Sequence, residues 1–269
     1  MTIAAACLTT EGVLFGADST QTFTFQNGTE KFYNNAQKIF EIGKPGESRF
    51  GLCVWGDALL GDLAHRTVAA RLSDLVRPDT RLQDLVQELL ALGKSEEATN
   101  GRVFVGCFLG GTQPGSRIPV CTRVMFGKKE EALLVLELPP LSALFQGAPR
   151  FFMRLHNGYD PELKDLILAG VKEEMVGSTD DEKEVAANAF SVIFDRSAGK
   201  LPPMQWPTMP LRDALDYLHT YLWATVKSHK FMLGSPICGG VIELAMVTSD
   251  RPFRWVRHKP FDSAINDSQ

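Results

Sequence analysis

Residues 2–20 of the chain read TIAAACLTTEGVLFGADST. Two apolar runs, 3–8 and 13–17, flank the polar segment TTEG, and this arrangement predicts a β-hairpin that opens close to the N-terminus. Both runs are almost continuously apolar instead of alternating with polar residues, so we expect strands that are buried on both faces. The hairpin would bring Asp18 and Ser19, at the end of its second strand, back beside Thr2.

Outward from this hairpin, the hydrophobic pattern predicts strands and helices in separate runs. Asn27-Gly28 follows the run TFTF and is a strong signal for a tight turn. Further strands are expected at 38–43, 49–55, 102–109, 118–126, 132–138, 240–248 and 253–257, and helices at 57–76, 81–93, 160–175, 181–195 and 211–229. Runs of strands followed by runs of helices favour an α+β fold. We expect a single domain, 1–269, with a helical insertion at about 147–208.

Composition restricts the class of function. The 269 residues are 44% hydrophobic and 22% charged, which is typical of a soluble globular protein. A net charge of -4 gives no basic footprint for nucleic acid or for an anionic membrane surface. No apolar stretch approaches the ~20 residues of a membrane helix, and no signal peptide is visible at the N-terminus. We therefore expect a cytoplasmic protein with no nucleic-acid or membrane partner.

The five cysteines are odd in number and show no CxxC spacing. Four of them lie in apolar runs, which predicts buried, reduced thiols. A disulfide framework or a zinc site is not indicated. No metal or cofactor is implied by the sequence.

Thr2 is a candidate nucleophile. Methionine is generally trimmed before a small residue, and removal of Met1 would leave Thr2 with a free α-amine beside its hydroxyl. An α-amine has an unperturbed pKa of roughly 7.7–8, so near neutral pH it can accept the hydroxyl proton. One residue would then supply both nucleophile and base. The position alone is a weak signal, because many chains begin Met-Thr.

Asp18 and Lys38 form a candidate pair. Asp18 ends an apolar strand, and a buried carboxylate needs a partner because burying it unpaired is costly. Lys38, at the start of KIFEIG, is the natural cation. Its ammonium beside Thr2 would stabilise an alkoxide there. The alternative interpretation is an ordinary turn Asp and a strand-end Lys.

Residues 2–20 resemble the opening of proteasome β subunits and of their bacterial relatives, HslV and the Anbu-type proteins. In that family a mature N-terminal Thr precedes a strand, a short turn with Gly, and a hydrophobic strand that ends in (G/A)-x-D-S. The interval from Thr2 to Asp18 equals that of the family. NAQKIFEI is similar to the segment with the family's catalytic lysine, which points to Lys38. Lys31 is the rival, because extra residues stand around QNGTEK.

The stretch RFGLCVWGDALLGDLAHR, residues 49–66, resembles the family's strand that leads into its first helix. There a glycine N–H faces the scissile carbonyl, which implies Gly56 as the oxyanion donor. Trp55 and Ala58 would flank the substrate pocket, and Ser19 would supply a further hydrogen bond.

The family pattern is not complete in this chain. Proteasome β subunits carry an Asp and a Ser in the loop after their last helix, where this chain has Ser235 and Cys238. In place of a Gly-Ser loop before the helical stretch stands FQGAP at 145–149. Both departures concern groups that support the Thr amine, and neither concerns the nucleophile.

The resemblance implies a four-layer α-β-β-α sandwich and a threonine-type peptidase that cleaves peptide or protein amide bonds through an acyl-enzyme. It also implies self-association in a ring or a spiral, with any ATPase partner unknown. Two alternatives remain. A catalytically silent relative with a structural or assembly role would retain Met1. A thiol hydrolase would use Cys7 or Cys53, although no His stands at a suggestive spacing.

Overall fold

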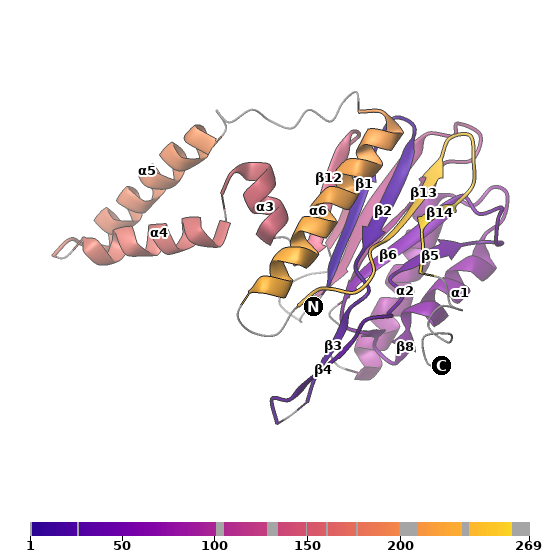
Figure 1. Cartoon of the computed structure of the whole chain (residues 1–269), viewed down its shortest axis with the longest axis horizontal. Helices are drawn as coiled ribbons and strands as arrows, with labels where there is room; N and C mark the ends of the chain where they lie inside the picture. The colour runs from indigo at the N-terminus through magenta and orange to yellow at the C-terminus, as the bar shows by residue number, and fades with distance from the viewer. Residues whose placement is uncertain are drawn as a thin grey trace. The chain divides into compact units, whose positions relative to one another are not determined.

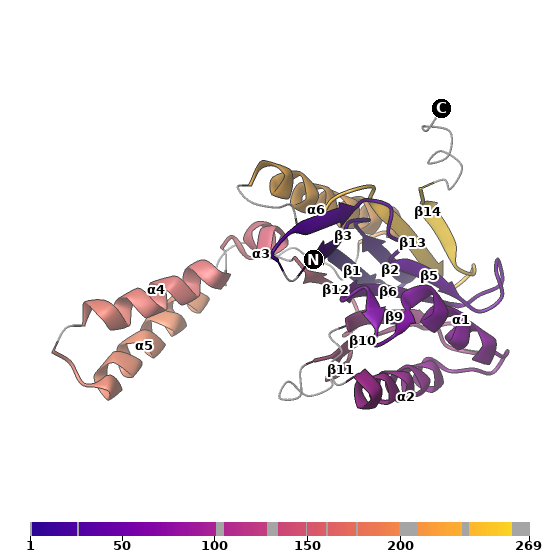
Figure 2. The same ribbon diagram turned by 90° about the horizontal axis from the view of Figure 1, so that it is seen from below.

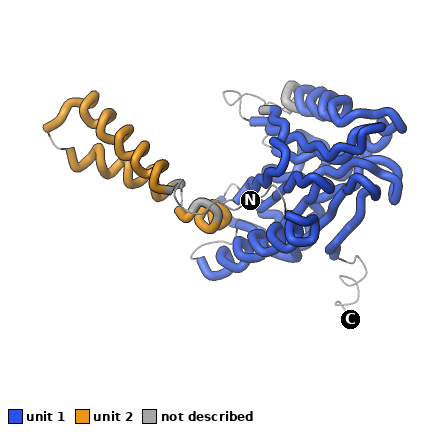
Figure 3. The backbone as a smooth tube through the Cα atoms, turned by 90° about the horizontal axis from the view of Figure 1, so that it is seen from above, with its two compact units in different colours: residues 1–148, 206–269 blue, residues 149–205 orange. Residues whose placement is uncertain are grey.

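The computed structural model describes residues 2–25, 27–100, 105–127, 134–148, 150–159, 161–175, 177–198, 209–232 and 237–259. The chain divides into two compact units, coloured separately in Figure 3. Unit 1 consists of Met1–Ala148 and Trp206–Gln269, and unit 2 consists of Pro149–Gln205. Unit 2 falls inside the range in which the sequence predicts a helical insertion.

The first sheet of unit 1 contains the N-terminal hairpin. Its antiparallel strand order is β12-β1-β2-β13-β14, with β1 at Ile3–Leu8, β2 at Gly12–Ala17, β12 at Ser142–Gly147, β13 at Glu243–Thr248 and β14 at Arg254–Arg257. The hydroxyl of Thr9 accepts hydrogen bonds from the Glu11 and Gly12 N–H groups and closes the turn between β1 and β2. Every residue of these two strands is buried, as their apolar runs predict.

The second sheet packs on the first. Its antiparallel order is β11-β10-β9-β6-β5, with β5 at Ile39–Ile42, β6 at Phe50–Gly56, β9 at Val105–Thr112, β10 at Pro119–Phe126 and β11 at Leu134–Glu137. Along β6, Cys53 and Trp55 join a core between the sheets, together with Phe15 and Phe108. Leu52 and Val54 point to the opposite face. This alternation is what strand geometry requires of a sheet covered on both sides.

Helices cover the outer faces of the two sheets (Figures 1 and 2). In Figure 2, α6 (Leu211–Phe231) lies on one side of the strands, and α1 (His65–Leu75) and α2 (Leu82–Asn100) lie on the other. A Cβ atom at Gly16 of β2 would meet Leu218 and Leu222 of α6, whereas Phe15 faces the second sheet. Leu72 and Leu85 pack under the other face of that second sheet. The fold is thus a mixed α/β arrangement of antiparallel sheets and helices.

The structure corrects one predicted helix. The expected helix at 57–76 begins only at His65, and two short paired strands, β7 (Leu59–Leu60) and β8 (Leu63–Ala64), precede it. Gly61 between them has a φ of 60°, a left-handed conformation that interrupts a helix.

Besides β7 and β8, three more strands were not predicted from the sequence. β12 pairs with β1, and β3 (Gln21–Thr24) pairs with β4 (Glu30–Tyr33) around the Asn27-Gly28 turn signal. The helix expected at 81–93 continues to Asn100. Parts of the expected strands at 102–109 and 132–138 lie outside the described residues.

Unit 2 is helical. Its helices are α3 (Arg150–Asn157), α4 (Pro161–Glu174) and α5 (Asp180–Ala198), and the last two agree with the predicted stretches. Ion pairs join Lys164 to Asp195 and Lys172 to Glu184, so α4 and α5 run antiparallel. Reciprocal hydrogen bonds between Thr179 and Glu182 form a capping box at the start of α5.

The cysteines and the helices can be compared with what the composition predicts. All five cysteines lie within the described residues, where they are free, and all five are buried as predicted. In the described ranges, no helix combines the length and the apolar character that a membrane crossing needs. Nor do three or more His, Cys, Asp or Glu side chains of those ranges gather into a possible metal site.

Candidate active site

Asp18 is the centre of a buried polar cluster at the end of β2. Its side chain is fully buried. Oδ1 accepts hydrogen bonds from Thr2 Oγ1 at 2.5 Å, Lys38 Nζ at 2.5 Å and Ile3 N at 3.1 Å, and Oδ2 accepts from Gly239 N at 2.8 Å and Thr20 N at 3.2 Å. Both carboxylate oxygens of this buried side chain therefore have hydrogen-bond donors.

The structure brings Thr2, Asp18 and Lys38 together at one oxygen atom. The Thr2 hydroxyl and the Lys38 ammonium both donate to Asp18 Oδ1, and Lys38 also donates to the carbonyl of Thr20 at 2.5 Å. Thr2 is 3% exposed and Lys38 is 7% exposed. The carboxylate therefore links a hydroxyl to a cation in a region with little access for water.

Backbone pairing explains why these residues meet. The β1–β2 register sets Ala4 opposite Ala17, and the Asp18 N–H donates to the Ile3 carbonyl at 3.1 Å. This register places Asp18 beside Thr2. Lys38 comes from the second sheet, where its carbonyl accepts a hydrogen bond from Val54 of β6 at 2.9 Å. Each sheet thus supplies one side of the ion pair.

Lys31, the rival to Lys38, lies elsewhere. It belongs to β4, where its ammonium is 5.1 Å from the centre of the Tyr33 ring. It is exposed, in contrast to Lys38. Of the two lysines, the structure places Lys38 against Asp18.

Ser19 is buried directly beside the cluster, but its hydroxyl does not point to Asp18. The hydroxyl donates to the carbonyl of Val241, and its backbone N–H donates to the Gly239 carbonyl at 3.0 Å. The Ser19 carbonyl accepts from Ala36 N–H at 2.9 Å. Ser19 therefore connects the end of β2 by hydrogen bonds to the segment before β13 and to the segment before Lys38.

Gly56, Ala58 and Trp55 have different environments. Gly56 is exposed at the end of β6 with a φ of 97°, and Ala58 is half-buried just after it. Trp55 is 4% exposed and packs on Phe108 in the core between the sheets, with ring centres 4.6 Å apart. A Cβ atom at Gly106 would come within 2.2 Å of the indole. The roles of Gly56, Ala58 and Trp55 toward a substrate stay predictions.

The sequence does not reveal the backbone groups of the site. The Thr20 carbonyl binds Lys38 and the Gly239 N–H binds Asp18, and neither role requires a particular side chain. Cys238, next to Gly239, is 1% exposed, and its burial raises the pKa of its thiol to about 12. Ser235 lies outside the described residues.

Gly147 was also missed as a contact of Thr2. It ends β12 opposite Ile3, with a φ of 88°. A Cβ atom there would lie 2.0 Å from the Thr2 carbonyl oxygen. The signal in the sequence is the glycine of FQGAP, since close backbone approach and a positive φ both favour glycine.

The thiols predicted for the alternative hydrolase are not activated. Burial raises the pKa of Cys7 to about 12 and raises that of Cys53 well above its ordinary value. A thiolate is the reactive form of cysteine, so both residues behave as apolar core side chains. Burial, with a smaller contribution from Lys38, lowers the pKa of His65 to about 4. This imidazole is neutral at pH 7.

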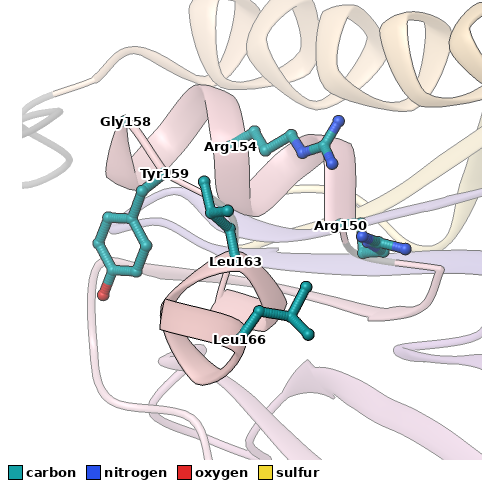
Figure 4. Close-up of a pocket in the computed structure, with 6 residues that line it drawn as sticks. All are labelled: Arg150, Arg154, Gly158, Tyr159, Leu163 and Leu166. Atoms are coloured by element: carbon teal, nitrogen blue, oxygen red, sulfur yellow. The ribbon is translucent and has the colours of Figure 1, made fainter. Parts of the chain in front are cut away.

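A separate pocket lies within unit 2 (Figure 4). It has a volume of about 500 Å³ and is lined by Arg150, Arg154, Gly158, Tyr159, Leu163 and Leu166. These residues come from α3, α4 and the turn between them. The pocket contains none of the residues that bind Asp18.

Comparisons with known proteins identify the fold. No protein-family model matches the chain, and no curated protein matches it. Among solved structures, the chain is similar to the Gly-1 mutant of Anbu from Hyphomicrobium sp. strain MC1. The TM-score is 0.59 at 14% identity, over 100% of this chain and 94% of the other. At this identity the likeness shows the fold alone, and that fold is the one of Anbu, one of the proteasome-like proteins that residues 2–20 resemble.

Proposed function

We propose that the chain is a threonine-type N-terminal nucleophile hydrolase that cleaves amide bonds of peptides or proteins. The observation that carries the proposal is the contact of Thr2 Oγ1 and Lys38 Nζ with the same buried oxygen of Asp18. A hydroxyl beside a buried ammonium is a favourable place for an alkoxide, because the cation stabilises the developing negative charge.

Processing comes first in the proposed mechanism. While Met1 is attached, the Thr2 nitrogen is an amide and cannot act as a base. Removal of Met1 converts it to an amine, which takes the proton of the Thr2 hydroxyl directly or through one water molecule. Asp18 holds Lys38 in place, and Lys38 lowers the energy of the charged oxygen.

The proposed reaction is an acyl transfer to Thr2 followed by hydrolysis of the resulting ester. Thr2 Oγ attacks the substrate carbonyl carbon, and the carbonyl oxygen becomes an oxyanion that the Gly56 N–H binds. Collapse of this intermediate breaks the C–N bond, and the α-ammonium gives its proton to the leaving amine. The resulting ester on Thr2 is hydrolysed by water, which regenerates the hydroxyl. In this proposal Trp55 and Ala58 flank the substrate, and Ser19 fixes the strand end next to Asp18 through its hydrogen bonds to Val241 and Gly239.

We further propose the layer order α6, first sheet, second sheet, then α1 with α2, which is a four-layer α-β-β-α sandwich. The faces of β2 and β6 support this order, because successive residues face a helix and the other sheet in turn. The likeness to Anbu and the sequence resemblance support self-association of copies of this chain. An ATPase partner is left open.

Covalent labelling tests the proposed nucleophile. The purified chain is treated with a β-lactone or an epoxyketone, and the adduct is located by intact mass and peptide mapping. We expect loss of Met1 and an adduct on Thr2. Thr2→Ala should abolish labelling and turnover, whereas Thr10→Ala, an exposed threonine in the hairpin turn, should leave both unchanged. An adduct on Cys7 or Cys53, or full turnover by Thr2→Ala, would overturn the proposal.

A second candidate function is a catalytically silent structural or assembly protein. The observation that favours it is the loop after α6, where Ser235 and Cys238 stand at the positions that resemble the Asp and Ser of proteasome β subunits, so that the Asp supporting the Thr amine is absent. The same mass measurement distinguishes the two candidates. Retained Met1 on the assembled protein supports the silent role, and loss of Met1 supports the enzyme.

A further inference from the structure

Glu243 is a second buried acid close to the Thr2 cluster. It begins β13 and is fully buried. Its strand partner is Ala17, the residue before Asp18. Paired residues of antiparallel strands point to the same face, and Ala17 belongs to the core between the two sheets. The Glu243 carboxylate therefore points between the sheets, where an unpaired charge is costly.

Two basic side chains after β14 face this carboxylate. His258 Nδ1 is 2.7 Å from Glu243 Oε1, and Lys259 Nζ is 3.5 Å from Oε2. Lys259 forms an ion pair with Glu243, whereas the His258 imidazole contributes a positive charge only when it is protonated. The Trp255 ring stacks on His258 with ring centres 4.0 Å apart and orders this part of the chain.

Lys259 also reaches the segment that carries Lys38. Its ammonium donates to the carbonyl of Ala36 at 2.8 Å, and its side chain is only 16% exposed. The N–H of Ala36 donates to the Ser19 carbonyl at 2.9 Å. Ala36 is thus bonded on both sides, two residues before Lys38. Hydrogen bonds therefore connect the segment before Lys38 both to the end of β2 and to Lys259.

The two acid–lysine pairs interact electrostatically. Burial lowers the pKa of Lys259, and Glu243 opposes that shift; Lys38 lowers the same pKa by repulsion, and Asp18 raises it. The Cys53 thiol responds to both Lys38 and Glu243. These couplings put Glu243 and Lys259 in the same buried region as Asp18 and Lys38.

We propose that Glu243 and Lys259 are positioning residues for the Thr2 site. Glu243 holds the Lys259 ammonium, Lys259 fixes the backbone at Ala36, and this backbone sets where Lys38 meets Asp18. Neither residue touches Thr2, so their effect on the reaction passes through Lys38. The inference rests on the proposed function for its catalytic consequence.

Lys259→Met tests the proposal. It keeps the aliphatic stem and removes the charge and the donor to Ala36. The matched control is Lys44→Met, which removes an exposed lysine paired with Glu47. The readouts are hydrogen exchange of the Ala36 amide and the labelling of Thr2 by a β-lactone, resolved into kinact and KI. We expect about tenfold faster exchange and about tenfold lower kinact with KI unchanged in Lys259→Met, and wild-type values in Lys44→Met.

Two further variants keep the test decisive. Lys259→Arg retains a cationic donor and should restore most of the labelling rate. Glu243→Gln removes the anchor charge with little change of shape, and it decides the question if Lys259→Met fails to fold. Wild-type exchange at Ala36, or wild-type kinact, in folded Lys259→Met or Glu243→Gln would overturn the inference. Absence of any Thr2 adduct on the wild-type chain would instead overturn the proposed function, and with it the catalytic role of the pair.

Discussion

At the scale of single residues, Asp18 and Lys38 differ in how many hydrogen-bond partners each would keep if the other were replaced. Asp18 accepts hydrogen bonds on both oxygens, from a hydroxyl, an ammonium and backbone N–H groups. Lys38 donates to Asp18 and to the Thr20 carbonyl. Loss of the lysine leaves a carboxylate that still has donors, whereas loss of the negative charge leaves a buried ammonium with only neutral acceptors.

This inequality predicts the order of two substitutions. Asp18→Asn should destabilise the fold by about 3–5 kcal/mol, because an uncompensated cation stays buried and the amide NH₂ must face a donor. Lys38→Met should cost about half as much, since backbone N–H groups continue to stabilise the carboxylate. Urea unfolding followed by tryptophan fluorescence measures both. Equal losses, or a larger loss for Lys38→Met, would contradict the predicted order.

Side-chain chemistry made part of the site predictable. Thr2, Asp18 and Lys38 can be found from the sequence because a nucleophile, a buried acid and a cation each require a particular residue type. The Thr20 carbonyl and the Gly239 N–H could not be found, since a backbone group is present at every position. Glu243 was missed because its ion-pair partners, His258 and Lys259, lie beyond the following strand and only the fold brings them together.

At the scale of elements, the pairing of β12 with β1 constrains the geometry at Thr2. Gly147 ends β12 in a left-handed conformation, against the Thr2 carbonyl. The hairpin of β1 and β2 was predictable from its continuous apolar runs. β12 was not, because SALFQG is short, mixes polar with apolar residues, and follows Pro139-Pro140.

Gly147→Ala should therefore be more harmful than an ordinary glycine substitution. The matched control is Gly115→Ala, in the turn between β9 and β10, where φ is 77° and a Cβ atom would meet nothing within 4 Å. The control should cost about 1 kcal/mol for its backbone conformation alone. Gly147→Ala adds a clash with the Thr2 carbonyl, so we expect a larger loss of stability in urea and slower labelling of Thr2. Similar losses for both variants would argue against a tight contact.

His65, the first residue of α1, predicts a dependence of stability on pH. The pKa of His65 is lowered from 6.5 to about 4 by burial and by Lys38, so the unfolded chain binds more protons than the folded chain between these values. Stability should fall as the pH decreases from about 6.5 to about 4, by on the order of 3 kcal/mol from this group. The free energy of unfolding should decrease less between pH 7 and pH 4 in His65→Leu than in the wild-type chain. Because each protein is compared with itself at the two pH values, any cost of the substitution at neutral pH does not enter the comparison. An unchanged pH dependence would show that His65 is solvated.

At the scale of the whole molecule, the chain combines a layered unit with a helical one. The two hydrophobic cores described above, on either face of the second sheet, consist of residues from unit 1. Unit 2 is held by contacts within itself, including the pairing of α4 with α5. Hydrophobic periodicity predicted α4 and α5. It could not assign them a role, because periodicity identifies a face of a helix and not what covers that face.

Deletion of residues 149–205, with a flexible Gly-Ser linker in their place, tests the role of unit 2. The cooperative unfolding of unit 1 should persist with an unchanged urea midpoint, since the two cores described above contain no residue of 149–205. Several large apolar side chains of α4 and α5 are more than half exposed, namely Leu163, Leu166, Val185, Val192 and Ile193. Exposed apolar side chains in such number favour association, so the assembled mass measured by light scattering should decrease.

A point variant separates association from gating in this experiment. Leu166→Ser in the intact chain should lower the assembled mass without altering the rate at which a small β-lactone labels Thr2, because the substitution removes apolar surface and leaves the chain continuous. If unit 2 instead gates the site, the deletion should accelerate labelling while Leu166→Ser leaves the mass unchanged. Unchanged mass together with unchanged labelling in the deletion variant would contradict both roles, and would leave unit 2 as an element whose exposed side chains serve neither assembly nor access to Thr2.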